Sequence, residues 1–123
     1  MATDLIRLMH ALFVPARESA GTASWRPPVD VYRTQRGWLV KFELAGVRPE
    51  DLRLSVRGNR LALQGARRDW CAEHGFSCYQ MEINYSRFER TLEFPVNLES
   101  AHIDTEYQYG LLLVRIRTEE DAK

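Results

Sequence analysis

The first residues of the chain carry apolar side chains at the spacing of one helix face. Leu5, Leu8, Met9 and Leu12 recur every three or four positions, Phe13 follows, and Pro15 ends the pattern. A helix of about three turns is not stable alone in water, so it needs a surface to pack on. Residues 1–24 are therefore expected to form a short amphipathic arm and a linker.

After residue 24 the apolar positions recur with a period of two, which is typical of β-strands. Seven such stretches follow one another, at residues 29–32, 38–44, 52–57, 61–63, 88–94, 103–107 and 111–116. The turn signals Arg36-Gly37, Gly58-Asn59 and Tyr109-Gly110 separate several of them. The pattern predicts an all-β, immunoglobulin-like sandwich over residues 25–118, followed by a short tail at 119–123.

One long connection, Arg67 to Ser77, does not alternate cleanly. It contains two large aromatic side chains, Trp70 and Phe76, among several charges. Burying such a ring is worth roughly 1.5–3 kcal/mol, so exposure of both rings is unfavourable. Long connections in compact domains are often functional. We expect this loop to reach a surface outside its own core, and a second subunit is the natural candidate.

Several separated segments, in this order, resemble the α-crystallin domain of small heat-shock proteins. They are Pro28-Val29-Asp30-Val31-Tyr32, Phe42-Glu43-Leu44-Ala45-Gly46-Val47, Pro49-Glu50-Asp51-Leu52, Leu61-Ala62-Leu63-Gln64-Gly65-Ala66-Arg67, Phe88-Glu89-Arg90-Thr91-Leu92-Glu93-Phe94-Pro95 and Tyr107-Gln108-Tyr109-Gly110-Leu111-Leu112. The resemblance covers about residues 25–118. It implies a chaperone fold whose long loop crosses to a partner chain.

The chain departs from that family pattern at three points. Ser86 stands where the family has Gly, and Thr105 stands where it usually has Ala. The family's C-terminal Ile-x-Ile/Val tail is missing. Val114-Arg115-Ile116 has that spelling, but it lies inside the last expected strand, where both apolar side chains are expected in the core. Without the tail, we expect a dimer or a small assembly.

The resemblance implies a homodimer formed by loop exchange, with Trp70, Phe76 and Arg90 at the contact. In the family the arginine that matches Arg90 forms an ion pair there, and a buried charge needs a partner. Asp69, Glu73 and Glu82 are the candidate partners here. The alternatives are a loop whose aromatic rings fold back on their own domain and an Arg90 exposed on an edge strand.

The resemblance also implies a groove at a sheet edge, lined by Leu52, Leu54, Val56, Ile103 and Thr105. An apolar edge can accept an added segment, such as an unfolded client. Alternatively, these side chains simply pack the interior. The arm residues Leu5, Leu8, Met9, Leu12 and Phe13 are a second candidate client surface, or else they hold an oligomer together.

Composition excludes several function classes. Seventeen basic side chains balance seventeen acidic ones, which disfavours nucleic acid, and no apolar run approaches the about 20 residues of a membrane span. The N-terminus has no secretory signal, and two cysteines suit a reducing cytoplasm. Cys71, His74 and Cys78 lack the spacing and number of a zinc site, so ordinary thiols are expected, with redox sensitivity a minor alternative.

No catalytic motif and no cofactor-binding motif occurs in the sequence. The leading hypothesis is an ATP-independent holding chaperone that binds partly unfolded proteins. The second is a specialised interaction or assembly module on the same fold, with one dedicated partner.

Overall fold

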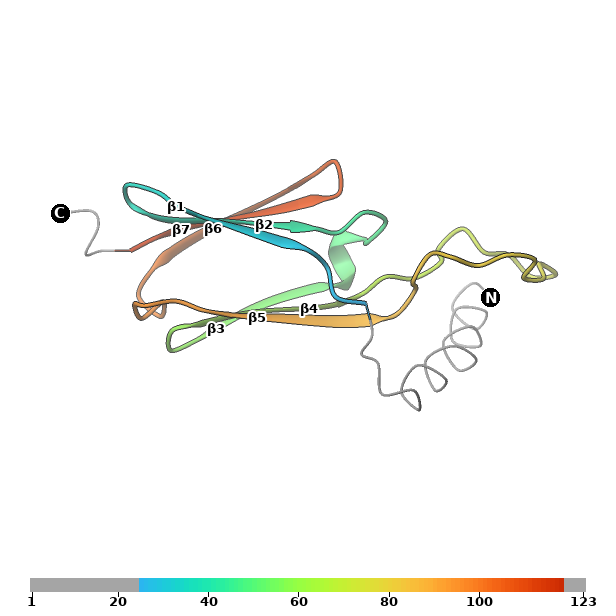
Figure 1. Ribbon diagram of the computed structural model, residues 1–123, viewed down its shortest axis with the longest axis horizontal. Helices are drawn as coiled ribbons and strands as arrows, with labels where there is room; N and C mark the ends of the chain where they lie inside the picture. Colours follow the sequence, from blue (N-terminus) through green and yellow to red (C-terminus); the bar gives the residue numbers. More distant parts are fainter. Residues whose placement is uncertain (1–24, 119–123) are drawn as a thin grey trace.

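The computed structural model describes residues 25–118, and these residues form an all-β domain (Figure 1). Its strands are β1 (Val29–Arg33), β2 (Gly37–Glu43), β3 (Leu52–Arg57), β4 (Arg60–Ala66), β5 (Arg87–Glu93), β6 (His102–Gln108) and β7 (Leu111–Arg117), with one 3-10 turn, η1 (Pro49–Asp51), before β3. The fold class expected from the period-two pattern is confirmed. The helix expected within residues 1–24 lies outside the described residues.

Two antiparallel sheets lie one above the other, as Figure 1 shows. The larger sheet has the strand order β1-β2-β7-β6, and the smaller has the order β3-β4-β5. Because neither sheet closes on itself, β1, β6, β3 and β5 are all edge strands. Each of them offers an unpaired row of backbone groups to another segment.

The core lies between the two sheets, where alternate side chains of each strand point inward. In β2, Val40 and Phe42 are fully buried, and Leu61 and Leu63 of β4 face them from the other sheet. Val114 and Ile116 of β7 are also buried, at 0% and 2% exposure. Val114-Arg115-Ile116 therefore lies within a core strand, as expected. Its two apolar side chains are not available to bind the groove of another subunit.

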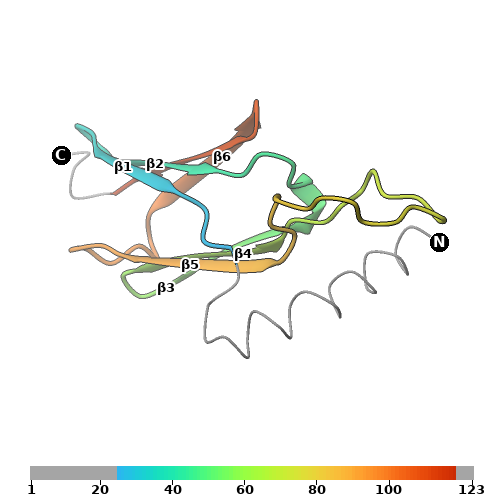
Figure 2. The same ribbon diagram turned by 45° about the vertical axis from the view of Figure 1, so that its right-hand side comes forward.

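The residues just before β1 fix which edges of the two sheets lie together. Trp25 packs edge-on against Phe88 of β5, with ring centroids 5.2 Å apart, and its backbone N–H donates to the hydroxyl of buried Ser86 at 3.0 Å. These contacts place β1 and β5 on the same side of the sandwich (Figure 2), so β6 and β3 form the opposite side. Ser86, which replaces the family's glycine, thus has a structural role.

Two hairpins have the tight turns that the sequence predicts. Gly58 and Asn59 connect β3 to β4, and Gly58 has a φ of 62°. Tyr109 and Gly110 connect β6 to β7, with φ values of 57° and 78°. Positive φ at the first central position only, as at Gly58, and positive φ at both, as at Tyr109 and Gly110, are typical of the two hairpin turns whose twist matches that of the flanking strands.

The connection between β4 and β5 projects beyond the end of the sandwich. It runs from Arg67 to Ser86 and forms the long extension in Figures 1 and 2. The sequence-based end of the loop at Ser77 was therefore wrong, because no strand lies between Ala66 and Arg87. Residues 79–83 alternate like a strand but pair with no strand among residues 25–118.

Candidate interaction surfaces

The projecting loop exposes apolar side chains along most of its length. Trp70 and Phe76, which the sequence singled out, are 55% and 63% exposed. Three further apolar residues were missed: Tyr79, Met81 and Ile83, of which Tyr79 is 99% exposed. Their alternation with polar residues was visible in the sequence as a period of two. Their exposure means that residues 25–118 of one chain leave much of this apolar surface uncovered.

The base of the loop is anchored by one arginine. Arg67 donates from Nε to the carbonyl oxygen of Asn84 at 2.9 Å and from Nη1 to that of Ala45 at 3.3 Å. Its guanidinium also lies over the indole ring of Trp25. Partial burial lowers the pKa of Arg67. These contacts tie both limbs of the loop and the start of the domain to one side chain.

A cavity of about 620 Å³ opens beside this anchor. Trp70 and Ile83 line it from the two limbs of the loop, and Trp25 lines it from the sandwich. Cys71 and Tyr85 also face it, and burial raises the pKa of the Tyr85 hydroxyl. The cavity has enough apolar lining to accept a side chain from another segment or chain.

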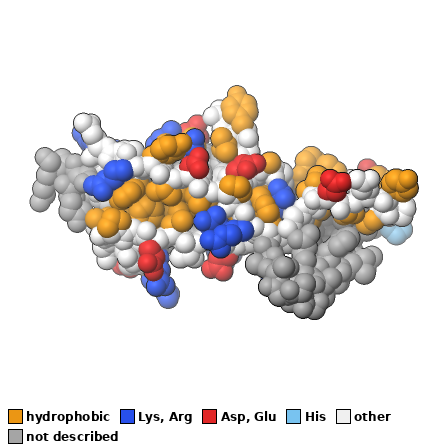
Figure 3. Space-filling model, in the orientation of Figure 1, with side chains coloured by type: hydrophobic (Ala, Val, Ile, Leu, Met, Phe, Trp, Pro, Cys, Tyr) orange, Lys and Arg blue, Asp and Glu red, His pale blue; other side chains and the backbone are white. Residues whose placement is uncertain are grey.

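The sandwich edge formed by β1 and β5 is a second apolar surface. Val31 and Tyr32 of β1 are 43% and 46% exposed, and Leu92 of β5 is half-buried. Figure 3 shows hydrophobic side chains along the seam between the two sheets on this face, and on the projecting loop. No local pattern in the sequence marks this edge, because pairing between distant strands decides which strands lie at an edge.

Arg90 lies half-buried on this same edge. Its Nη1 donates to the carbonyl oxygen of Pro27 at 2.7 Å. Burial lowers its pKa, and the nearby charge of Arg26 lowers it further. Within residues 25–118 no carboxylate forms an ion pair with Arg90. Its expected partners Asp69, Glu73 and Glu82 all belong to the loop connection, which extends away from the sandwich (Figure 1).

The five expected groove residues lie on β3 and β6, at the opposite side of the sandwich. Their side chains face inward from these two edge strands, as their register with buried Leu63 and Val114 shows. Four are half-buried and contact the core: Leu52, Leu54, Val56 and Ile103. Thr105 is exposed. Both interpretations therefore hold in part: the buried portions of the four apolar side chains pack the interior, and their exposed portions line the sheet edge.

The cysteines of the loop are both free and exposed. No group of three or more His, Cys, Asp or Glu side chains that could hold a metal ion occurs between residues 25 and 118. In that same part of the chain, no helix is long and apolar enough to cross a bilayer. The arm residues Leu5, Leu8, Met9, Leu12 and Phe13 lie outside the described residues.

Comparison with known proteins shows which family the sequence resembles. A family model described as the Hsp20/alpha crystallin family matches residues 30–123. The 18 kDa heat shock protein of Streptomyces albus is 30% identical over all of this chain and 87% of its own length. A chloroplastic small heat shock protein of Solanum lycopersicum is 29% identical over 98% of this chain and 53% of its own.

Solved structures agree with this result. HSP18.5 from E. histolytica superimposes with a TM-score of 0.66 and 28% identity, over 77% of this chain and 89% of that one. The chain spans between half and two thirds of the length of several curated relatives that it matches, 63%, 53% and 60%. The match of the family model to most of the sandwich shows that the chain belongs to the Hsp20/alpha crystallin family.

Proposed function

We propose that this protein is an ATP-independent holding chaperone that binds partly unfolded proteins and limits their aggregation. One observation carries the proposal: large apolar side chains stay exposed on the projecting loop and at the open sheet edge. Exposed apolar groups that are not covered by the protein's own core are available to other chains. Membership of the Hsp20/alpha crystallin family gives the general chaperone role.

The working unit in this proposal is a homodimer in which each loop crosses to the other chain. Tyr79, Met81 and Ile83 alternate like a strand, and β1 is an edge strand with free backbone groups. Addition of the loop to β1 of a second copy would satisfy both sets of backbone groups. It would also cover the rings of Trp70 and Phe76, each worth roughly 1.5–3 kcal/mol when buried.

Arg90 supports the same arrangement. Its side chain is partly withdrawn from water and, among the described residues, bonds only to a backbone carbonyl. Asp69, Glu73 and Glu82 lie in the loop that would cross to the second copy. In a loop-exchanged dimer, a carboxylate from one chain would therefore meet Arg90 of the other and neutralise its charge.

Client binding is assigned to two surfaces. The first is the edge groove lined by Leu52, Leu54, Val56, Ile103 and Thr105, whose strands β3 and β6 are free to accept an added segment. The second is the arm, through Leu5, Leu8, Met9, Leu12 and Phe13. Neither surface requires a cofactor, a metal or a catalytic residue, so the proposed activity is not enzymatic. A cytoplasmic location remains a prediction.

The test is suppression of light scattering from a heated model client. At substoichiometric to equimolar protein we expect less scattering, in the presence and in the absence of ATP. Circular dichroism recorded in parallel shows whether the protein itself stays folded. Unchanged scattering with a folded protein contradicts the chaperone proposal. Mass measurement in solution tests the dimer separately, since a monomer at micromolar concentration excludes loop exchange.

The alternative is an interaction or assembly module with one dedicated partner. In this alternative, the groove on the free edges of β3 and β6 would bind that one partner instead of unfolded proteins. A pulldown that recovers one dominant partner instead of many denatured proteins would support this alternative. A redox role for Cys71 and Cys78 is tested by their double replacement with serine, which should leave client protection unchanged.

A further inference from the structure

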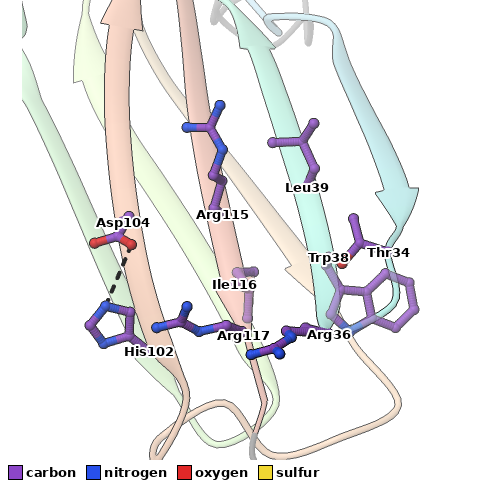
Figure 4. A pocket seen from close by; sticks show the side chains of 9 residues that line it. All are labelled: Thr34, Arg36, Trp38, Leu39, His102, Asp104, Arg115, Ile116 and Arg117. Carbon is purple, nitrogen blue, oxygen red and sulfur yellow. Dashed lines mark ion pairs between the residues drawn. The ribbon is translucent and has the colours of Figure 1, made fainter. Parts of the chain in front are cut away.

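The larger sheet carries a basic hollow at the end remote from the projecting loop, reaching from the β1–β2 turn to the edge strand β6. Its volume is about 240 Å³. Figure 4 shows the side chains that line it, from the turn before β2 and from β2, β7 and β6. Three of them are arginines: Arg36, Arg115 and Arg117.

Two carboxylates lie at or beside the hollow. Asp104 lies 3.4 Å from Nε2 of His102, which forms an ion pair with it only when the imidazole is protonated, and Glu106 accepts a bond from Arg115 at 3.0 Å. No ion pair joins Arg36 or Arg117 to a carboxylate within residues 25–118. The hollow therefore holds two exposed guanidinium groups that form no ion pair with a carboxylate of the described residues.

The sheet register brings these two arginines to neighbouring rows at the end of the sheet. Arg117 pairs with Gly37 on one side and with His102 on the other, and Arg36 immediately precedes Gly37. The backbone N–H of Thr118, the residue after Arg117, donates to the carbonyl oxygen of Arg36 at 3.0 Å, which holds the two arginines close along the chain ends of β7 and β2. Figure 4 shows the side chain of Arg36 extending toward Arg117. Like charges placed together repel each other unless an anion lies between them.

We propose that Arg36 and Arg117 form an anion site that binds a phosphate group. The two oxygens of a carboxylate accept a bidentate pair of hydrogen bonds from one guanidinium group. A phosphate has enough acceptor oxygens to bind two guanidinium groups in this way. A phosphate monoester carries a charge of about −1.5 to −2 at neutral pH, which matches the charge of two guanidinium groups. The site is independent of the chaperone proposal, because it shares no residue with the loop or the groove.

The three tryptophans of the chain allow a local measurement. Trp38 lines the hollow, whereas Trp25 and Trp70 line the cavity at the base of the loop. The full chain, labelled with ¹⁵N, is titrated with inorganic phosphate and with O-phosphoserine at constant ionic strength. We expect a saturable shift of the Trp38 indole N–H signal and none for the other two. Acetate, titrated in the same way, should bind more weakly.

Matched variants identify the groups responsible. Arg36→Gln with Arg117→Gln should weaken phosphate binding at least about tenfold, because each fork makes charge-assisted hydrogen bonds. Arg53→Gln with Arg57→Gln removes the same charge from exposed positions on β3 and should leave binding unchanged. Circular dichroism and thermal unfolding show that both pairs remain folded. Equal loss in both pairs would indicate a net-charge effect and overturn the assignment.

The acidic residues Glu119, Glu120 and Asp121 follow in the sequence and could compete for the same arginines. The titration is therefore repeated with Glu119→Gln, Glu120→Gln and Asp121→Asn combined. A saturable Trp38 shift with phosphate in either chain supports the site. Absence of the shift in both chains, or binding of acetate as tight as that of phosphate, would falsify it.

Discussion

The guanidinium group of Arg67 stacks on the indole ring of Trp25, with its central carbon 3.7 Å from the ring centroid. Arg67 begins the projecting loop, and Trp25 begins the sandwich. The same arginine bonds to carbonyl oxygens of Ala45 and Asn84. The direction in which the loop leaves the sandwich is therefore determined by contacts that lie outside any strand.

Replacement of this anchor tests that role. We expect Arg67→Ala to lower the free energy of unfolding by about 1–2 kcal/mol, through loss of the stacking and of the two hydrogen bonds. Urea denaturation measures the change. Arg57→Ala removes an exposed arginine at the end of β3 and should change stability by less than about 0.5 kcal/mol. Equal effects of the two substitutions would contradict the anchoring role.

Gly65 in β4 is expected to tolerate no side chain. A Cβ at this position would lie 2.7 Å from the ring of Phe88 and 2.8 Å from the backbone oxygen of Asp51. We expect Gly65→Ala to lower the free energy of unfolding by about 1–3 kcal/mol, since backbone and ring must move apart. Gln64→Ala, at the exposed neighbouring position, is the control and should be nearly neutral. Thermal or chemical unfolding distinguishes the two.

Tyr107 links β6 to the segment after β2. Its hydroxyl donates to the carbonyl oxygen of Leu44 at 2.8 Å, and the carbonyl oxygen of Val47 also lies within reach. We expect Tyr107→Phe to lower stability by about 0.5–1.5 kcal/mol at neutral pH, because these buried carbonyls lose their donor. Denaturation at pH 7 measures it.

The same residue predicts a pH dependence. Burial raises the pKa of Tyr107 in the folded chain above its value in the unfolded chain. Between these two values the folded state binds more protons than the unfolded state, so stability falls as the pH rises above about 10. The contribution is fully present below that pH. In Tyr107→Phe the alkaline loss of stability should be smaller, and an unchanged alkaline profile would exclude this tyrosine as its source.

The alternating side chains of the loop should control dimer formation. We expect Tyr79→Ser with Ile83→Ser to raise the dimer dissociation constant at least about tenfold, since two large side chains lose their buried contacts. Analytical ultracentrifugation measures the constant. Tyr109→Ser is the matched control, because Tyr109 is 93% exposed but lies in the β6–β7 turn. A dimer unaffected by the loop changes would point to another interface.

Arg90 gives an independent test of the same interface. If a carboxylate of the second chain pairs with it, Arg90→Gln weakens the dimer and reduces the salt dependence of dissociation. Arg87→Gln, at an exposed position of the same strand, should change neither quantity. Sedimentation at low and high salt separates the two outcomes. A salt dependence that persists in Arg90→Gln would show that this charge has no role across the interface.

Sequence reasoning was most successful where the signal is local. The alternation of Val40 and Phe42 with polar residues, and the Gly58-Asn59 turn, correctly predict strands and hairpins because both depend on neighbouring residues. The loop was bounded at Ser77 because the stretch without clean alternation ends there, whereas the connection continues to Ser86 and its alternating residues 79–83 pair with no strand among the described residues. The basic hollow gave no sequence signal, since Arg36 and Arg117 are far apart along the chain.

The sequence by itself determined the all-β class, the order of the strands and the residues of the core, because side-chain alternation decides which face of a strand avoids water. Only the tertiary structure decided which strands lie at the sheet edges, where the loop emerges and which charges meet. Those features depend on register between distant strands, such as the pairing of Gly37 with Arg117, and on single contacts such as that of Arg90 with Pro27. Such contacts join residues far apart along the chain, so no periodic pattern in the sequence reveals them.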